Sequence, residues 1–549
     1  MQLDFSELFL CGDVNYSSDD LPLGALLSYI GFTPDTEMEE LGRYISGSMI
    51  EAAFYIDRYA RPTLATRGIM GNRVNAVWLS PDHRRLLQDL QNFGTVRKSI
   101  ESGDMRYHFV AGYLISDSGI FCTLTLTAQT AYALKKYGGD ALRNLYLNRF
   151  TDRNNPWYGA TYYSETQGGS DLGMCTTTAI ETEGRWRLTG HEKYFASNAG
   201  IADGAIVTAR PEGAPPGARG IAVYFVPAKR TDGEDNYIVR RLKDKLGTIA
   251  VPTGEVELEG SEGMLLGEKG KGIYYAMEIL SISRIDDALA AAGIARKALW
   301  EAYRFACKRS AFGKSIISHP LLARDFIELE SDLEAALAVS LVAAKHFSEG
   351  SNSTPPYDDG YNFARMLTHI AKNMASETGA AVTKYALEIM GGRGFLSEFP
   401  MEKFHRDELV TSIWEGTSNI QALDLLELMT KKRTHEILYR TLGGIVSRCR
   451  DSELKVALTD ALERTRLEVG EMLRSDVSDF YGKDILRALG IVTAAVYFQD
   501  AADSPAGETL KPMARTYIER HMLKRRADPE LLERAVSLEW MEAGRSRNF

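Results

Sequence analysis

The segment Ile413–Gln421 places one carboxylate, that of Glu415, on a short turn directly before an apolar run with helical spacing. Gly416 permits the tight backbone geometry of such a turn, and Thr417 and Ser418 are residue types that often begin helices. A carboxylate held on a turn beside an apolar surface can act as a general base that takes a proton from carbon. A motif this short also fits an acidic residue that merely precedes a helix cap, so other motifs in the chain must decide.

Length, charge and cysteine use limit the classes of protein to which the chain can belong. At 549 residues it is too long for one hydrophobic core, and about three or four domains are expected. The net charge of −10 argues against a general nucleic-acid binder, which needs a basic face. Five scattered cysteines form no C-x-x-C pair, so neither a zinc site, nor any other metal site, nor a disulfide framework is expected. The acidic segment Met1–Glu7 lacks the apolar core of a secretion signal and no apolar run is long enough for a membrane span, which predicts a cytoplasmic protein.

Four segments of different pattern follow one another and predict four domains. Residues 1–153 are expected to form an N-terminal helical domain, and residues 154–268 a small β domain made of short alternating segments. Residues 269–433 return to long helical patterns and contain Glu415. Residues 434–549 are expected to form an extra C-terminal helical domain.

The individual elements of these domains can be predicted from apolar periodicity and turn residues. Helices are expected at Leu41–Tyr59, Arg84–Phe93, Gly119–Lys136, Ile285–Ala306, Pro320–Ser348, Tyr361–Met390 and Asn419–Lys432. Strands are expected at Thr176–Thr182, Trp186–Thr189, Ala205–Ala209, Ile221–Pro227 and Gly254–Leu258. Between the first two strands, Glu183-Gly184 is a hairpin turn signal.

Four further motifs accompany the Glu415 turn. The segment Tyr162–Asp171 contains two adjacent glycines that let the backbone approach a ligand, together with serine hydroxyls. The segment Lys193–Asn198 predicts a strand with a large aromatic residue two positions before a hydroxyl. Arg309–Gly313 and Met390–Gly394 follow in that order before Glu415.

This order of motifs resembles the acyl-CoA dehydrogenase family of flavoproteins, over about residues 40–430. The length of the chain, the segment Arg241–Gly247 and the segment Ser412–Gly416 look most like the AidB branch of that family. The resemblance implies an α+β multidomain fold with an N-terminal helical domain, a small β-barrel-like middle domain, a helical bundle and an extra C-terminal helical domain.

The resemblance also implies FAD as the cofactor, between the β domain and the helical bundle. The residues implied to contact it are Tyr163, Ser164, Gly169, Ser170, Phe195, Ser197, Arg309, Phe312, Gly391, Gly392, Gly416, Thr417 and Asn419. Arg309, Phe312 and the Gly391-Gly392 loop would reach the FAD of a neighbouring subunit, so a homotetramer built as a dimer of dimers is implied. Three residues depart from the family pattern: Phe195 replaces a usual Trp, and Pro320 and Glu388 each replace a usual Gln.

Glu415 is the implied base for the α-proton of an acyl-CoA thioester. The β-hydride would pass to flavin N5, and the backbone N–H at position 415 with a ribityl hydroxyl would stabilise the developing enolate. Burial would raise the pKa of Glu415 toward neutrality. Arg284 is expected to begin the long helix, and it resembles a family arginine near the active site. It equally fits a helix-surface or salt-bridged arginine beside Asp286 and Asp287.

Three functions fit the sequence. The leading hypothesis is an FAD-dependent acyl-CoA dehydrogenase that forms an enoyl thioester, with an electron-transfer protein as a further candidate partner. The alternative is an AidB-like flavoprotein with weak dehydrogenase activity and a DNA-associated role in the alkylation stress response. Residues 435–549 hold 18 Lys+Arg against 19 Asp+Glu, which speaks against DNA binding. A third reading is another flavin reaction such as nitroalkane oxidation, but enzymes of that type place Asp at the position of the base.

Overall fold

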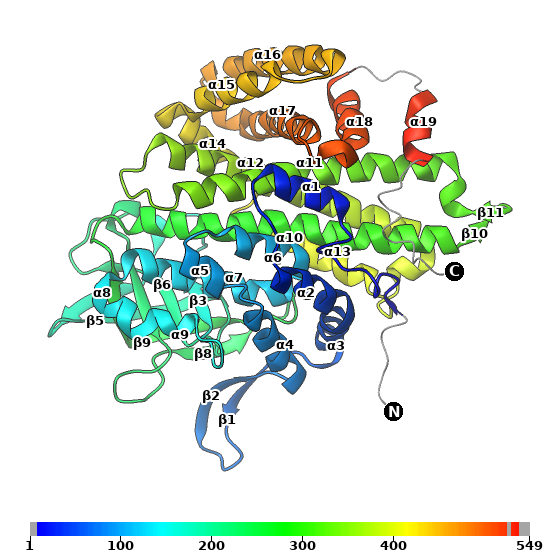
Figure 1. Cartoon of the computed structure of the whole chain (residues 1–549). Coiled ribbons are helices and arrows are strands. Elements are labelled where there is room, and N and C mark those ends of the chain that lie inside the picture. Colours follow the sequence, from blue (N-terminus) through cyan, green and yellow to red (C-terminus); the bar gives the residue numbers. More distant parts are fainter. Residues whose placement is uncertain (1–7, 524–528, 537–549) are drawn as a thin grey trace. The chain divides into compact units, whose positions relative to one another are not determined.

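The computed structural model describes residues 8–523 and 529–536, which fall into two compact units (Figure 1). Unit 1 comprises Met1–Glu51, Phe109–Ser116 and Arg284–Phe549, and unit 2 comprises Ala52–His108 and Asp117–Ser283. Met1–Glu7, on which the expected absence of a secretion signal rests, lies outside the described residues.

Unit 1 is helical. Its elements are α1 (Leu21–Tyr29), α2 (Thr36–Tyr44), η2 (Ile45–Met49), the C-terminal part of α10 (Gly272–Lys308), the strands β10 (Ser310–Ala311) and β11 (Lys314–Ser315), η6 (Ile316–Ser318), α11 (Pro320–Gly350), α12 (Asp359–Ile389), η7 (Gly391–Phe395), α13 (Met401–Leu409), η8 (Val410–Ser412), α14 (Ser418–Lys432), α15 (Thr434–Ser447), α16 (Ser452–Arg474), η9 (Ser478–Tyr481), α17 (Gly482–Ala502), η10 (Gly507–Leu510), α18 (Lys511–Met522) and α19 (Pro529–Val536).

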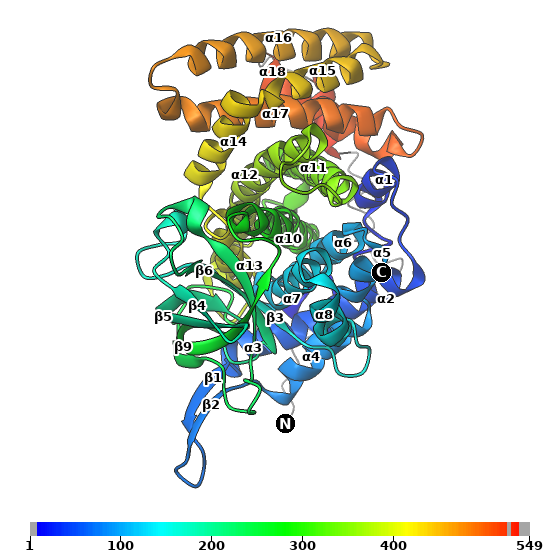
Figure 2. The same ribbon diagram turned by 90° about the vertical axis from the view of Figure 1, so that its left-hand side faces the viewer.

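Long helices form the core of unit 1. Helices α11 and α12 run side by side and pack along their length, and α17 lies against α11, α12 and α14 (Figure 2). The start of α12 is fixed by Asp358, whose carboxylate accepts a hydrogen bond of 2.8 Å from the backbone N–H of Tyr361. Helices α15 to α18 therefore pack within the same compact unit as the segment that contains Glu415.

Unit 2 combines helices with a β-sheet. Its elements are α3 (Ile50–Tyr59), β1 (Thr63–Arg67), β2 (Arg73–Trp78), α4 (Pro81–Asn92), α5 (Arg97–Ser102), α6 (Arg106–Ile115, whose last turns belong to unit 1), α7 (Ser118–Tyr137), α8 (Gly139–Leu142), η3 (Arg143–Leu147), α9 (Asn148–Phe150), β3 (Gly159–Tyr162), η4 (Leu172–Met174), β4 (Thr178–Thr182), β5 (Arg185–Ser197), β6 (Gly204–Pro211), η5 (Ala218–Gly220), β7 (Ala222–Pro227), β8 (Ile238–Leu242), β9 (Thr253–Leu266) and the N-terminal part of α10.

The seven-stranded sheet of unit 2 closes on itself. Its strands are hydrogen-bonded in the order β3-β6-β4-β5-β9-β7, and β8 pairs with β9 outside this order. Strand β7, the last of the order, also pairs with β6, the second, and this pairing closes the sheet. Aromatic and aliphatic side chains from its inner face, such as Tyr162, Trp186 and Tyr224, fill the interior. The predicted β-barrel-like middle domain is therefore confirmed.

Most predicted elements are present, with differences at their ends. The Glu183-Gly184 hairpin is confirmed: both residues have positive φ, 52° and 74°, as a two-residue hairpin turn between β4 and β5 requires. The expected helix Leu41–Tyr59 is interrupted by η2, and the β1–β2 hairpin was not predicted from the sequence. The expectation that Arg284 begins the long helix is wrong, because the apolar stripe continues upstream through Ile279 and α10 begins at Gly272.

Within residues 8–523 and 529–536, one helix is long and apolar enough to be considered as a membrane span. The segment Ser478–Ala502, which contains α17, passes by length and composition, but 78% of its most apolar window is buried within the structure. Such burial is typical of a core helix, since its apolar faces are already covered by protein. The division into four domains at residues 153, 268 and 433 remains a prediction.

Candidate active site

The Glu415 turn, defined here as residues 413–417, connects η8 to α14 in unit 1. Glu415 has φ +56° and Gly416 has φ +100°, so two successive residues adopt the left-handed region. That region is unfavourable for a residue with a Cβ atom and easy for glycine. The Glu415 side chain is partly exposed. The turn thus presents a carboxylate from a backbone conformation that surrounding contacts must hold in place.

Buried side chains from three helices bind the carbonyl oxygens of this turn. Arg284 of α10 donates from Nε to the carbonyl oxygen of Glu415 over 2.9 Å. Lys372 of α12 donates from Nζ to that of Gly416 over 2.5 Å. Gln421 of α14 donates from Nε2 to both carbonyl oxygens, over 3.1 and 2.8 Å. We call Arg284, Lys372 and Gln421 the carbonyl clamp.

Arg284 is positioned by an ion pair within unit 1. Its Nη1 lies 3.2 Å from Asp424 Oδ2, and the side chain is almost completely buried. The structure therefore places Arg284 in the middle of α10, beside Glu415. A direct contact with substrate remains a prediction.

The charged groups around the turn have perturbed pKa values. Burial lowers the pKa of Lys372 to about 8, although Asp287 and Glu415 nearby favour its charged form. Burial raises the pKa of Asp287 well above its ordinary value, and the negative charge of Glu415 adds to this effect. A titratable lysine and a carboxyl group thus lie within electrostatic range of Glu415, which is the pattern expected at a site that moves protons.

A second group of predicted residues comes together in unit 2. The backbone N–H of Tyr194 donates to the carbonyl oxygen of Ser164 over 2.9 Å, which fastens the 164–170 loop to β5. Phe195 on β5 is 59% exposed, and Ser197 lies 3.2 Å from Thr253 through their hydroxyl oxygens. We call Ser164, Phe195 and Ser197 the Phe195 face. It offers an exposed aromatic ring, with the Ser197 hydroxyl two residues further along β5 and the Ser164 hydroxyl on the loop that pairs with Tyr194.

A buried ion pair supports the Phe195 face. Lys193 Nζ lies 2.9 Å from Glu165 Oε1, and both side chains are buried. Burial alone would raise the pKa of Glu165, but the ammonium of Lys193 and hydrogen bonds from Thr177 and Gln167 lower it overall. Because Glu165 follows Ser164 and Lys193 precedes Tyr194, the pair joins the loop to the strand.

The remaining predicted cofactor residues are exposed or lie outside these two groups. Phe312, which is 96% exposed, lies in the turn between β10 and β11. Arg309 and the Gly391-Gly392 segment are also exposed. Thr417 is the N-cap of α14 but its side chain makes no capping hydrogen bond, and Asn419 in the first turn is exposed. Their contact with the cofactor of the same or a neighbouring subunit remains a prediction. Tyr163 is buried and Ser170 is exposed in the 164–170 region.

Comparison with known proteins identifies the family. The sequence of residues 160–261 matches the family model of the acyl-CoA dehydrogenase middle domain. The sequence of residues 270–429 matches the family model of the acyl-CoA dehydrogenase C-terminal domain. Acyl-CoA dehydrogenase family member 11 of Caenorhabditis elegans is 28% identical over 436 residues, 76% of this chain and 68% of its own length. The chain belongs to the acyl-CoA dehydrogenase family.

Two further similarities define how far the relationship extends. AidB of Escherichia coli (strain K12) is 32% identical over 271 residues, 49% of this chain and 48% of AidB, so the match spans about half of that relative. The solved structure of Caenorhabditis elegans ACDH-11 in complex with C11-CoA has a TM-score of 0.82 at 22% identity, over 97% of this chain and 94% of that one. The fold is thus shared over nearly the whole chain. Family membership places the protein among FAD-dependent oxidoreductases that act on CH–CH bonds.

The residues of unit 2 fit the cofactor of this family. A flavin needs a flat apolar surface and hydrogen-bond donors at its edge, and the Phe195 face supplies both. Gly169 lets the Ser164 hydroxyl lie close against the loop backbone, because an added Cβ would approach Ser164 Oγ to 2.1 Å. Phe195, Ser164 and Ser197 are therefore the residues of unit 2 that would hold FAD.

Several residues of the site were not predicted from the sequence. Lys372, His369 and Asp424 carried no recognised motif, and Asp287 was considered only as a neighbour of Arg284; their places at the site depend on helix packing. Gln421 ends the motif that drew attention to Glu415, and its place four residues into α14 could have suggested a side chain that reaches back to the turn. Of the residues that depart from the family pattern, Pro320 begins α11 and Glu388 pairs with Lys384 on the surface of α12.

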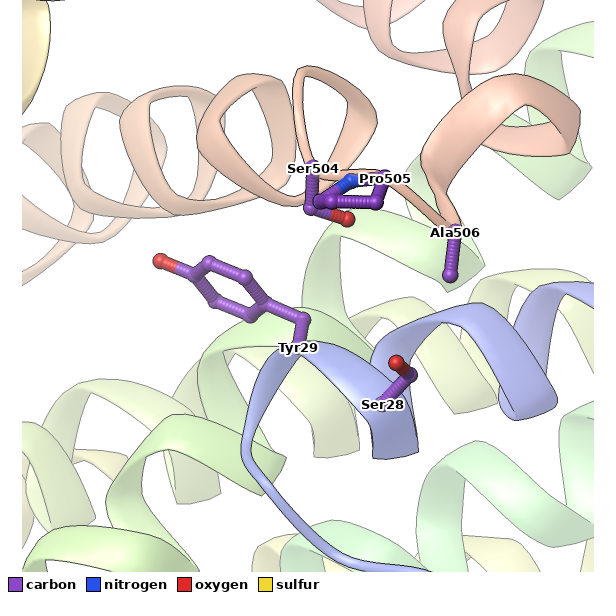
Figure 3. Close-up of a pocket in the computed structure, with 5 residues that line it drawn as sticks. All are labelled: Ser28, Tyr29, Ser504, Pro505 and Ala506. Carbon is purple, nitrogen blue, oxygen red and sulfur yellow. The ribbon is translucent and has the colours of Figure 1, made fainter.

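A cavity of unit 1 has a lining that does not include the Glu415 turn. It has a volume of about 510 Å³ and is lined by Ser28, Tyr29 and the segment 504–506 (Figure 3). Tyr29 donates from its hydroxyl to Asp500 Oδ2 over 2.7 Å. None of the predicted site residues lines this cavity, so we assign the candidate active site to the Glu415 turn.

Proposed function

We propose that the protein is an FAD-dependent acyl-CoA dehydrogenase in which Glu415 takes the α-proton of an acyl-CoA thioester. The product is an enoyl thioester, because loss of the α-proton as H⁺ and of a β-hydrogen as hydride leaves a double bond. Bound FAD supplies the acceptor for that hydride. The observation that carries the proposal is the Glu415 carboxylate on a left-handed turn whose carbonyl oxygens are bound by buried side chains.

The residues around Glu415 support the role of base. Arg284 and Gln421 bind the backbone of the turn, so the carboxylate starts from a defined position. The ammonium of Lys372 lies in electrostatic range of Glu415 and favours its ionised form, which can accept a proton. Glu415 then holds the α-proton on its carboxyl group.

The comparisons favour an acyl-CoA substrate. The solved ACDH-11 structure, whose fold this chain shares, contains C11-CoA. Its medium-length acyl chain makes straight-chain acyl-CoA thioesters the first compounds to try. The homotetramer, the cytoplasmic location and an electron-transfer protein as acceptor are part of the same proposal.

Flavin bleaching tests this function. The FAD-loaded protein is mixed without oxygen with straight-chain and branched acyl-CoAs of increasing length, and the visible absorbance of oxidised flavin is followed. At least one acyl-CoA should bleach the flavin, and Glu415→Gln should slow bleaching about 10²- to 10⁴-fold with FAD still bound. Glu427→Gln, on the more exposed side of α14, is the matched control and should bleach normally. No bleaching by any acyl-CoA, or normal bleaching in Glu415→Gln, would contradict the proposal.

The DNA-associated alternative has a separate test. If residues 435–549 bound DNA, affinity should fall steeply between low and moderate salt, because phosphate contacts release counterions. The nearly balanced charge of that segment favours no binding. A gel-shift experiment with duplex DNA at two salt concentrations distinguishes the two functions, since a salt-sensitive shift supports only the alternative.

A further inference from the structure

We propose that Lys372 and Gln421 are positioning residues, which hold the carbonyl oxygens of Glu415 and Gly416 and thereby aim the Glu415 carboxylate at the substrate. This inference rests on the proposed function, because it takes Glu415 as the base. It adds two residues to which the sequence analysis gave no role.

The Glu415 turn needs external contacts to keep its shape. A residue with a Cβ atom is disfavoured in the left-handed region, yet Glu415 adopts φ +56° directly before Gly416 at φ +100°. The side chain of the N-cap Thr417 makes no capping hydrogen bond, so the usual local device for fixing the start of a helix is absent at α14. The conformation of Glu415 is therefore maintained by groups that come from elsewhere.

Gln421 is built to hold two carbonyl oxygens at once. Its Nε2 has two hydrogens and donates to Glu415 O over 3.1 Å and to Gly416 O over 2.8 Å. Its side chain is fully buried, so no water competes for these bonds. One neutral amide thus fixes the direction in which the peptide groups on both sides of Gly416 point.

His369 fixes the orientation of the Gln421 amide. His369 Nδ1 lies 2.7 Å from Gln421 Oε1, and burial lowers the pKa of His369 to about 3, so the ring is neutral near pH 7. An amide oxygen can only accept, so the proton of the neutral ring must be on Nδ1. The opposite orientation of the amide would turn Oε1 toward the carbonyl oxygens of Glu415 and Gly416, which would place acceptors against acceptors and leave both carbonyl oxygens without Nε2.

Lys372 contributes position and charge together. Its Nζ donates to Gly416 O over 2.5 Å from the interior of α12. The charged or titratable groups in range are Arg284 and Asp287 on α10, Glu377 on α12 and Glu415 itself, and Glu408 on α13 faces Asp287. Replacing Lys372 therefore changes the charge felt by Glu415, whereas replacing Gln421 changes its position without removing a charge.

A proton-exchange experiment separates positioning from the rest of the reaction. The probe is 3-thiaoctanoyl-CoA, in which sulfur replaces the β-carbon, so the α-proton can leave and no β-hydride can follow. The FAD-loaded full-length protein is incubated with it in deuterated water, and α-deuterium uptake is measured by mass spectrometry across pH. Glu415→Gln should abolish the uptake.

The variants differ in the outcome expected for rate and for pH midpoint. Gln421→Leu should slow exchange about 10- to 100-fold, because a small displacement of a base has effects of that size, with the pH midpoint unchanged. Lys372→Met should slow exchange and raise the pH midpoint by about one unit, since loss of a nearby cation disfavours the carboxylate. Lys372→Arg keeps a charged donor and should restore most of the rate and the midpoint.

Matched controls separate positioning from loss of folding. Gln499→Leu removes another buried glutamine amide, on α17, and Lys403→Met removes another buried lysine, on α13. Both should exchange the probe at the rate of the unchanged protein. Gln421→Met has nearly the volume of the original residue and keeps the test valid if Gln421→Leu fails to fold. Amide hydrogen exchange of a peptide that spans residues 410–424 should also be faster in both Gln421 variants.

Failure of this inference can be told apart from failure of the proposed function. If Glu415→Gln still exchanges the α-proton, Glu415 is not the base and the proposed function fails. If Glu415→Gln abolishes exchange while the Gln421 and Lys372 variants match the unchanged protein in rate, midpoint and amide protection, only the positioning role is overturned. A slower rate in the Gln499 and Lys403 controls equal to that in the clamp variants would also overturn it.

Discussion

The Glu415 turn and the Phe195 face are held in place in opposite ways. Side chains from three helices bind the carbonyl oxygens of the turn, and its backbone adopts a disfavoured conformation. The Phe195 face lies on β5, whose backbone pairs with β4 and β9, and a buried ion pair fixes the adjoining loop. A backbone held by side chains is sensitive to single substitutions near the chemistry. A surface supported by a sheet keeps its shape, so substitutions there should change stability or cofactor affinity instead.

The largest effect on stability is expected from the ion pair beneath the Phe195 face. Lys193→Met removes the partner of Glu165, and a buried carboxylate without its counter-charge should lower the free energy of unfolding by about 3–5 kcal/mol. Guanidinium denaturation, followed by far-ultraviolet circular dichroism and tryptophan fluorescence, measures it.

The double variant Glu165→Leu with Lys193→Met is the control for that effect. It removes both charges together and should be less destabilised than Lys193→Met alone, because no unpaired charge remains. If Lys193→Met lowers the free energy of unfolding by less than about 1 kcal/mol, the range of an exposed pair, the ion pair does not support the face.

Acid should weaken the turn through His369. Its pKa is lowered by burial to about 3, below the ordinary 6.5 of an unfolded chain. Its contribution to stability is therefore complete above pH 6.5 and is lost as pH falls from 6.5 toward 3, by about 2 kcal/mol between pH 7 and pH 5. Denaturation at a series of pH values should show a smaller fall for His369→Gln.

A second buried histidine tests whether this sensitivity is specific to the turn. Burial lowers the pKa of His83, in α4 of unit 2, to about 4, so its stability contribution has the same sign and nearly the same pH range. His83→Gln should also reduce the pH dependence of stability. Only His369→Gln should slow flavin bleaching, because only His369 contacts the carbonyl clamp. Equal slowing in both variants would show that the effect on bleaching is not specific to the Glu415 turn.

Two glycines allow the same substitution to be compared in both regions. In Gly416→Ala the new Cβ lies 2.9 Å from Ile420 Cγ2, at a φ of +100°, so a loss of about 1–2 kcal/mol and slower bleaching are expected. In Gly169→Ala the closest atom is the rotatable Ser164 Oγ, and no positive φ is involved. This variant should unfold nearly as the unchanged protein does and should release FAD more readily. Denaturation and FAD titration measure both properties, and a larger stability loss in Gly169→Ala would reverse the comparison.

The sequence predicted what depends on local pattern. The Glu183-Gly184 hairpin follows from residues that accept positive φ, and the order of helices and strands follows from apolar periodicity. The β1–β2 hairpin was not predicted, because no residue of Thr63–Arg67 is fully buried and neither Thr63–Arg67 nor Arg73–Trp78 shows a clear alternation of apolar and polar residues. The position of Glu415 before a helix was predicted because motif and helix are adjacent in the sequence.

The contacts that shape the site could not be predicted in the same way. Lys372 and Gly416 are separated by 44 residues, and His369 and Gln421 by 52, so their meeting depends on how α12 packs against α14. The left-handed conformation of Glu415 has no signal in its residue type, since glutamate normally avoids it. A buried lysine or histidine within an apolar helix pattern is the one trace that such contacts leave in a sequence.

The smallest expected effect concerns the exposed ring of the Phe195 face. Phe195→Ala should raise the dissociation constant of FAD about fivefold, because one aromatic stacking contact is worth about 1 kcal/mol. The free energy of unfolding of the cofactor-free protein should change by less than about 0.5 kcal/mol, since 59% of the side chain is exposed and little packing is lost. Phe195→Trp keeps an aromatic surface and should bind FAD at least as tightly, whereas Phe480→Ala, at an exposed site in unit 1, should leave affinity unchanged. If FAD titration shows equal affinity for Phe195→Ala and the unchanged protein, the ring does not contact the cofactor. The sheet would then present only the hydroxyls of Ser164 and Ser197 to FAD.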